Sequence, residues 1–277
     1  MFDLENTLFL SDLDGTLLRG DQKISAYTAQ VIPALIEKGM HFSYATARSR
    51  HTAIRAADLP LSLPIIVYNG AAVMDSRTGE RLLARQFAPK EACMILDALL
   101  AADVQPIVYA WRKTGETFSY CLEAVNADTR AFLLTRRGDV RDHPVQTEAD
   151  LLAGDVFYFT CIDTPERLEP LYRRFSGRFS CVYSRDPYTG GQWLELMPAD
   201  TGKAQAACWL CNHLGCTHLV AFGDGENDRL LFESADAAYA VANAVSELKK
   251  LATAVIESHE DDGPARWLWE HYGSGVD

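Results

Sequence analysis

Residues 7–18 of the chain read Thr-Leu-Phe-Leu-Ser-Asp-Leu-Asp-Gly-Thr-Leu-Leu. The first five residues form a largely apolar run, which is typical of a strand buried on both faces of a parallel sheet. Two carboxylates, Asp12 and Asp14, follow at once, and Gly15 permits a tight turn. Open α/β sheets bind ligands beyond the carboxyl ends of their strands. The stretch therefore predicts a parallel sheet with an acidic site after its first strand.

The alternation of strands and helices continues on both sides of the middle of the chain. The expected strands are 41–46, 64–68, 218–222 and 237–241, and the expected helices are 25–38, 201–214 and 244–252. Apolar strands separated by helices are typical of an α/β, Rossmann-like parallel sheet covered on both faces. We expect the two parts to complete one such sheet.

The middle of the chain has a different pattern. Its expected strands are 105–110, 117–121, 156–161, 179–184 and 192–197, and its expected helices are 90–101, 123–135 and 165–175. We interpret residues 88–197 as an α+β cap domain inserted into a catalytic core domain made of 1–87 and 198–277. The crossing segments, Leu83–Ala88 and Met197–Asp200, are the expected hinges.

Composition indicates an ordinary folded protein with an acidic surface. Among 277 residues, 48% are hydrophobic and 23% are charged, which is close to the globular average. With 26 basic and 38 acidic residues the net charge is −12, which repels nucleic acid and anionic membranes. We therefore expect neither as a partner. A small anionic substrate would need locally placed cations or a metal ion.

Apolar runs, the first residues and the cysteines bear on the expected location of the protein. It has no run of about 18 apolar residues, and its first residues are acidic where a secretory signal is basic. Its seven cysteines are odd in number and lie mostly in apolar runs, as expected for reduced thiols. These features predict a cytoplasmic protein, which we expect to be a monomer or a homodimer.

A second acidic cluster follows the strand expected at 218–222. Residues 223–228 read Gly-Asp-Gly-Glu-Asn-Asp. Asp12, Asp224 and Asp228 would meet at one sheet edge and repel one another unless a cation lay among them, and oxygen ligands favour Mg²⁺. A surface turn or a partial calcium loop is the alternative, although the later Glu and the ligand alternation of an EF-hand loop are missing.

Two further segments are candidates for holding phosphate. Thr46-Ala47-Arg48-Ser49 follows the second strand, and a hydroxyl with backbone amides at a helix start can bind a phosphate oxygen. Lys203 lies in the first turn of the next expected helix, where a cation is unfavourable because it opposes the helix dipole. Its presence there needs another explanation, and neutralising phosphate charge would be one. The alternatives are a simple helix cap with a surface arginine, and a solvated lysine.

Together these segments resemble the haloacid-dehalogenase-like phosphatase superfamily, and within it the Cof-type members with a large α/β cap. The resemblance spans nearly the whole chain. It is carried by Asp12-Leu-Asp14-Gly-Thr-Leu-Leu, Thr46, Lys203, the 223–228 segment, Asn69-Gly70-Ala71 and Glu260-Asp261-Asp262-Gly263. Ala47 and Ala242 stand where the family usually has glycine, and Pro264 replaces a more usual apolar residue.

The resemblance implies a Mg²⁺-dependent phosphomonoester hydrolase. Asp12 would be the nucleophile that forms an aspartyl-phosphate, and Asp14 would protonate the leaving alcohol and then activate water. The implied metal ligands are Asp12, the backbone carbonyl of Asp14 and Asp224, with Asp228 in support. The implied phosphate contacts are Thr46, Lys203, Asn227 and the backbone amides of Leu13 and Ala47.

Other functions stay open at this point. A phosphomutase or phosphotransferase would use the same aspartyl-phosphate, and a catalytically silent phosphate-binding regulator would keep the fold alone. The substrate is expected to be a sugar phosphate or another small phosphorylated metabolite. Because the reacting residues fall outside 88–197, we expect the cap to close over the site and choose the leaving group, with Arg185 and Tyr188 as candidate contacts.

A zinc site is the remaining alternative. Cys208, Cys211, Cys216, His213 and His218 have the right ligand chemistry. The segment 204–214 reads as a helix whose apolar face includes both Cys208 and Cys211, and the paired Cys-x-x-Cys spacing occurs once. We therefore interpret these cysteines as packed thiols.

Overall fold

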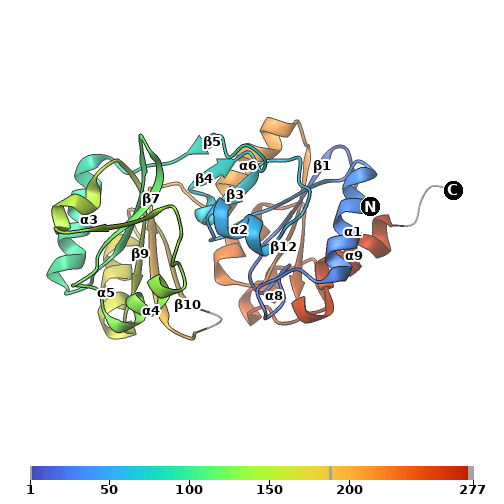
Figure 1. Ribbon diagram of the computed structural model, residues 1–277. Helices are drawn as coiled ribbons and strands as arrows, with labels where there is room; N and C mark the ends of the chain where they lie inside the picture. The colour runs from blue at the N-terminus through green and yellow to red at the C-terminus, as the bar shows by residue number, and fades with distance from the viewer. Residues whose placement is uncertain (1, 187–188, 274–277) are drawn as a thin grey trace. The chain divides into compact units, whose positions relative to one another are not determined.

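The computed structural model describes residues 2–186 and 189–273. The chain divides into two compact units, which Figure 1 shows. The core unit consists of the residues up to Ala84 and those from Gly202 onward, and the inserted unit is Arg85–Thr201. The inserted unit thus extends a few residues beyond the interval 88–197 on each side. Tyr188, one of the candidate cap contacts, lies outside the described residues.

The core unit is built on a five-stranded parallel sheet with the strand order β14-β13-β12-β1-β2. The strands are β1 (Thr7–Ser11), β2 (His41–Tyr44), β12 (His218–Gly223), β13 (Ala237–Val241) and β14 (Ala254–Ile256). Every residue of β1 is buried, as its apolar run predicts. Ser11 lies opposite both Phe222 and Tyr44, so three strands end at the same edge. The predicted fold class, a parallel core sheet with an α+β insertion, is confirmed.

Helices cover both faces of this sheet. They are α1 (Ala26–Glu37), α2 (Arg50–Ala56), α6 (Lys203–Leu214), α7 (Arg229–Ser234), α8 (Ser246–Leu251) and α9 (Gly263–Tyr272). Leu8 and Leu10 belong to one hydrophobic cluster with Leu210 of α6. Phe9 points to the opposite face, where its ring lies 5.2 Å from that of Tyr272 in α9. The period-2 alternation of β1 thus supplies apolar side chains to both layers.

The strand expected at 64–68 has a different partner from the one predicted. It forms β3 (Ile65–Val67), which pairs antiparallel with β4 (Ala72–Met74), and β4 pairs with β5 (Arg81–Ala84). An isolated parallel bridge from Ala45 to Ile66 links β3 to the end of β2. Asn69 and Gly70, at φ 50° and 93°, turn the chain back after β3. Placing this strand in the parallel sheet was therefore wrong.

The inserted unit contains a six-stranded sheet with the order β10-β11-β9-β6-β7-β8. Its strands are β6 (Ile107–Arg112), β7 (Gly115–Cys121), β8 (Asp142–Val145), β9 (Asp155–Ile162), β10 (Ser180–Arg185) and β11 (Gln192–Met197), and its helices are α3 (Pro89–Ala101), α4 (Ala127–Leu134) and α5 (Pro165–Phe175). Apart from β7 with β8, neighbouring strands run antiparallel. Leu99 of α3 and Leu171 of α5 share a core with Phe159 of β9.

Short 3-10 turns complete the described structure at Tyr68–Gly70, Glu148–Leu152, Glu226–Asp228 and His259–Asp261. Across residues 2–186 and 189–273, no helix has the length and apolarity needed to cross a membrane.

Candidate active site

Asp12 stands at the carboxyl end of β1. Its backbone amide donates to the carbonyl of Phe222 at 2.9 Å, which continues the pairing of β1 with β12. The residue is only 5% exposed, because the sheet and the following loop surround it. Its Oδ1 accepts a hydrogen bond from the amide of Leu13 at 2.6 Å. Asp12 is therefore a buried carboxylate held in one orientation by the sheet edge.

Lys203, the first residue of α6, lies between two carboxylates. Its Nζ is 2.9 Å from Oδ2 of Asp12 and 2.6 Å from Oδ1 of Asp228, and the residue is 2% exposed. Burial alone would lower the pKa of Lys203, but the charges of Asp12 and Asp228 outweigh it and raise the pKa above its ordinary value. The lysine is a fixed cation, which explains its unfavourable place in the first helical turn.

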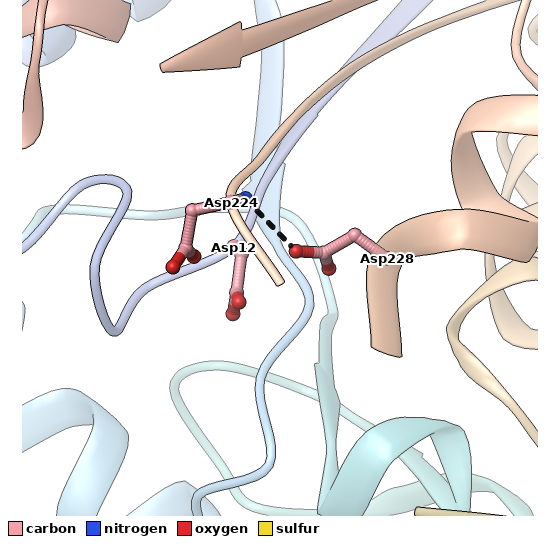
Figure 2. Close-up of side chains that lie close together, drawn as sticks. All are labelled: Asp12, Asp224 and Asp228. Atoms are coloured by element: carbon pink, nitrogen blue, oxygen red, sulfur yellow. Dashed lines mark hydrogen bonds between the residues drawn. The ribbon is translucent and has the colours of Figure 1, made fainter. Parts of the chain in front are cut away.

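Asp224 and Asp228 complete the acidic group after β12. Asp12, Asp224 and Asp228 each offer a carboxylate oxygen, and the three oxygens lie within 4.8 Å of one another. Figure 2 shows the three side chains together, with the amide of Asp224 donating to Oδ2 of Asp228 at 3.1 Å. The amide of Gly225 donates to the same oxygen at 3.1 Å. The structure thus brings together the three carboxylates that the sequence predicted would meet.

The group carries more negative charge than Lys203 balances. Burial raises the pKa of Asp12 well above its ordinary value, Lys203 opposes the rise, and Asp228 and Asp224 add to it. Burial, with the charge of Asp228, likewise raises the pKa of Asp224 to about 7. Closely spaced carboxylate oxygens with surplus charge suit a hard divalent cation, which would favour their ionised forms. The residues therefore fit Mg²⁺.

The loop after Asp12 is shaped to leave room for Asp224. Gly15 has φ +75°, and a Cβ at this position would lie 2.5 Å from Oδ2 of Asp224. Both the backbone conformation and the space therefore require glycine. The next residue, Thr16, donates from Oγ1 to Oδ1 of Asp224 at 2.8 Å. Thr16 was not among the predicted site residues, because nothing in the sequence relates it to a carboxylate more than 200 positions away.

Asp14 has a partner that the sequence did not identify. Arg48 donates from Nε to Oδ2 of Asp14 at 2.7 Å and from Nη2 to Oδ1 at 2.5 Å. This two-point geometry matches the guanidinium fork to the carboxylate. A third bond joins Nη2 of Arg48 to Oε1 of Gln22 at 3.1 Å. Arg48 is therefore a site residue, although its segment could equally be read as a helix cap with a surface arginine.

The predicted phosphate contacts lie around the same sheet edge. Thr46 is fully buried, and its Oγ1 accepts from the amide of Arg48 at 3.0 Å. Helix α2 begins only at Arg50, and Ser49 caps it by accepting from the amide of Thr52. Thr46 and the half-buried Ala47 therefore lie in the loop before the helix and not at its first turn.

Asn227 donates from Nδ2 to Oδ1 of Asn69 at 3.1 Å. This bond connects the 3-10 turn after β12 with the turn after β3, where Asn69 is 2% exposed. Asn69 was recognised as a recurrent family feature but was not predicted as a site residue. Its contact with Asn227 places it beside the candidate phosphate contacts.

The cysteines near the end of α6 do not form the alternative zinc site. In the part of the chain that the structure describes, Asp12, Asp224 and Asp228 are the one group of three or more potential ligands close enough to share an ion. Cys208 is exposed, whereas Cys216 is buried with its Sγ 3.3 Å from Nδ1 of His41. The interpretation as thiols packed around a helix end agrees with this geometry.

Comparisons with known proteins agree with the fold. The family model for haloacid dehalogenase-like hydrolases matches residues 9–268. The 5-amino-6-(5-phospho-D-ribitylamino)uracil phosphatase YwtE of Bacillus subtilis is 26% identical over 277 residues, covering 93% of this chain and 95% of its own.

Two solved structures have the same fold. A haloacid dehalogenase-like hydrolase from B. subtilis has a TM-score of 0.79 at 20% identity and covers 95% of this chain and 99% of its own. The subclass IIB sugar phosphatase BT4131 has a TM-score of 0.75 at 19% identity, with coverage of 96% and 99%. The resemblance seen in the motifs is confirmed, and the chain belongs to the haloacid dehalogenase-like hydrolase family.

Proposed function

We propose that the protein is a Mg²⁺-dependent phosphomonoester hydrolase that works through an aspartyl-phosphate on Asp12. The observation that carries the proposal is the group at the ends of β1 and β12. There a buried carboxylate lies against a lysine cation and two further carboxylates, all in the core unit. Such a group combines a fixed anionic nucleophile with the charges needed to hold a phosphate beside it.

In the first half of the proposed reaction an oxygen of the Asp12 carboxylate attacks the phosphorus of the ester. A bond forms between that oxygen and phosphorus while the bond from phosphorus to the leaving oxygen breaks. Asp14 gives its proton to the leaving oxygen, so that an alcohol departs and the phosphoryl group stays on Asp12. Lys203 balances charge on the attacking carboxylate and on the phosphoryl oxygens.

Arg48 is proposed to hold the Asp14 side chain in place between turnovers. It donates from Nε and Nη2 to the two carboxylate oxygens of Asp14 at 2.7 and 2.5 Å. A two-point bond of this kind fixes the orientation of the carboxylate as well as its position.

The second half of the proposed reaction releases phosphate. Asp14, now a carboxylate, accepts a proton from a water molecule whose oxygen attacks phosphorus. The bond between phosphorus and Asp12 breaks, which restores the Asp12 carboxylate and releases inorganic phosphate. The same residue thus serves first as a general acid and then as a general base, because the carboxylate that has given up its proton can accept one from water.

Mg²⁺ would be held by Asp12, Asp224 and the backbone carbonyl of Asp14, with Asp228 in support. When bound, it supplies positive charge that offsets repulsion between the carboxylate and the phosphate dianion. Asp228 is also tied to Lys203 and to two backbone amides, so its part is to fix the surrounding residues.

Phosphate oxygens are proposed to contact Thr46, Lys203, Asn227 and the backbone amides of Leu13 and Ala47. The amide of Leu13 donates to Asp12 in the substrate-free protein. For this amide to hold phosphate, the bond has to pass from the Asp12 carboxylate to a phosphoryl oxygen as the ester binds. An amide already directed at the reacting carboxylate needs little movement to do so.

The inserted unit is proposed to act as the cap that selects the leaving group. All the residues named for the chemistry belong to the core unit, which leaves the inserted unit free to vary with the substrate. The proposed substrates are small phosphorylated metabolites, with sugar phosphates as the first class to test. Phosphorylated ribitylamino-pyrimidines come next, because YwtE is named for such a compound.

The test is a panel of phosphate esters incubated with purified protein and Mg²⁺, followed by acid quenching and peptide mass spectrometry. We expect release of inorganic phosphate and a phosphoryl group on the peptide that contains Asp12. Borohydride reduction of the quenched protein should convert residue 12 to homoserine. Phosphate release without any label at Asp12 would contradict the covalent route, and no phosphate release from any ester would contradict the hydrolase itself.

A further inference from the structure

The loop that carries Asp14 is fastened by a residue from the far end of the chain. Asn243, just after β13, donates from Nδ2 to the carbonyl of Gly15 at 2.7 Å. Its Oδ1 accepts from the amide of His259 at 3.1 Å. The exposed side chain of Asn243 thus uses its amide nitrogen and its amide oxygen to bond to the backbones of two separate segments, and it joins them.

The position of this bridge links two parts of the candidate site. Gly15 directly follows Asp14 and directly precedes Thr16, whose hydroxyl holds Asp224. The carbonyl of Gly15 belongs to the peptide that joins Gly15 to Thr16, and the amide of that peptide donates to the carbonyl of Leu13 at 3.2 Å. Fixing this one peptide therefore fixes the turn on which Asp14 sits.

A second set of contacts holds the other end of the same loop. Asp262, only 4% exposed, accepts from Nε and Nη2 of Arg19 at 3.2 and 2.7 Å. Glu260 accepts from the amide of Gly20 at 2.8 Å. Glu260 lies in the 3-10 turn that begins with His259, and Asp262 lies at the start of α9. His259 is the residue to which Asn243 is also bonded. The segment 259–262 thus holds the loop after Asp14 at two points. It contacts Arg19 and Gly20 directly, and it reaches Gly15 through Asn243.

We propose that Asn243 is a positioning residue for Asp14, with Asp262 as its second support. The inference rests on the proposed function, in which Asp14 protonates the leaving oxygen. The hydrogen bond from Asn243 to Gly15 keeps the Asp14 turn in the place from which the carboxyl reaches that oxygen. Misplacing a catalytic group by about 1 Å can cost on the order of 100-fold in rate.

The sharpest variant is Asn243→Asp, which keeps the shape of the side chain. An aspartate can still accept from the amide of His259, but it has no donor for the carbonyl of Gly15. The variant therefore replaces the hydrogen bond to Gly15 by repulsion between two oxygens, and it leaves the bond from His259 in place. Asp262→Asn is the second variant, because it weakens the grip on Arg19 without altering Asn243.

The readout is kcat/KM on two esters of similar size, benzyl phosphate and 4-nitrophenyl phosphate. Benzyl alcohol needs a proton as it leaves, whereas nitrophenolate is stable as an anion, so only the first depends strongly on an acid. We expect Asn243→Asp to lower kcat/KM for benzyl phosphate by about 10- to 100-fold. The loss for 4-nitrophenyl phosphate should stay within about threefold. Asp262→Asn should show the same selectivity with a smaller loss.

The matched control is Asn212→Asp, which makes the same change on the exposed face of α6 and should leave both rates unaltered. Equal losses on the two esters in the Asn243 and Asp262 variants would overturn the proposal, because a general structural defect does not distinguish leaving groups. Unchanged rates would overturn it as well. If the unsubstituted protein releases phosphate from no ester of the panel, these two included, the proposed hydrolase fails instead, and that result is separate.

Discussion

Each of the two units buries a basic side chain between two carboxylates, but the two clusters differ in how much negative charge remains unbalanced. In the core unit Lys203 lies 2.9 Å from Asp12 and 2.6 Å from Asp228. In the inserted unit Arg141, 7% exposed, takes the corresponding place. Buried charges alone therefore do not mark a catalytic site in this protein.

The cluster around Arg141 is a compact ion-pair network. Its Nη1 lies 2.5 Å from Oε1 of Glu116, and its Nε and Nη2 lie 2.9 and 2.6 Å from the two oxygens of Asp139. Glu116 belongs to β7, whereas Asp139 lies just before β8, the strand that pairs with β7. The fork of one arginine thus joins two neighbouring segments, which is a structural use of buried charge.

The cluster around Lys203 adds a third carboxylate and draws its members from distant segments. Asp224 joins Asp12 and Asp228 within 4.8 Å, and its pKa rises to about 7 because burial and Asp228 disfavour its charge. A single lysine charge leaves this group of carboxylates with surplus negative charge that a further cation would relieve. The surplus, and its place at strand ends, separates a candidate site from a structural ion-pair network.

The largest expected effect comes from Asp12→Asn. The amide has nearly the same shape, but it lacks the anionic oxygen that attacks phosphorus, so turnover should fall by about 10⁴-fold or more. The urea midpoint of unfolding should change little, because Lys203 keeps its ion pair with Asp228. Steady-state phosphate release together with urea unfolding checks both. Turnover close to that of the unsubstituted protein would contradict attack by Asp12.

Removing divalent metal should have an effect of similar size. Chelation should reduce phosphate release to background, and Mg²⁺ should restore it, because the three carboxylates need a cation to accept a phosphate dianion. Ca²⁺ should restore little, since its larger and looser coordination shell positions the nucleophile poorly. Elemental analysis of the chelated protein is the control. Full activity in metal-free protein would refute the metal requirement.

The meeting of the three carboxylates was predictable from the sequence for a geometric reason. Strands of a parallel sheet end at one edge, so Asp12 after β1 and Asp224 after β12 had to lie near each other. Lys203 was recognisable because a cation in a first helical turn is unfavourable without a partner. Predicting β3 in the same sheet failed because the left-handed conformation of Asn69 that reverses the chain leaves no mark in an apolar pattern.

The contacts that hold the loops together could not be predicted in the same way. Arg48 on Asp14 and Asn243 on Gly15 depend on how two loops face each other, and hydrophobic periodicity carries no information about that. From the sequence, a polar side chain in a loop could equally well point into solvent. A parallel sheet determines at which edge its strands end, whereas hydrogen bonds between loops can be recognised only in the three-dimensional structure.

Arg141→Ala tests the other cluster and should act on stability and not on chemistry. Removing the guanidinium takes away the cation that the half-buried carboxylates of Glu116 and Asp139 share, which should lower the free energy of unfolding by about 3 kcal/mol. Urea unfolding measures that loss. The kcat of the remaining folded protein should stay within about twofold, since the network belongs to the inserted unit. A loss of kcat as large as that of Asp12→Asn would break the distinction between the clusters.

The smallest expected effect concerns the carboxylate that distinguishes the two clusters. Thr16 is fully buried, and its hydroxyl donates to Oδ1 of Asp224 at 2.8 Å. Valine has the same shape without the donor, so Thr16→Val leaves Asp224 in place but free to turn. Loss of such an orienting bond typically weakens metal binding by about tenfold. We therefore expect the Mg²⁺ concentration for half-maximal activity to rise by about that factor, while kcat at saturating Mg²⁺ stays nearly unchanged.

The matched control is Thr135→Val in the inserted unit, where the hydroxyl bonds to the carbonyl of Phe132 and Mg²⁺ dependence should not move. If the Mg²⁺ dependence of Thr16→Val were unaltered, the hydrogen bond from Thr16 would not orient Asp224. Asp12 and Asp228 would then be enough to hold Asp224 in place, without support from the loop that carries Asp14.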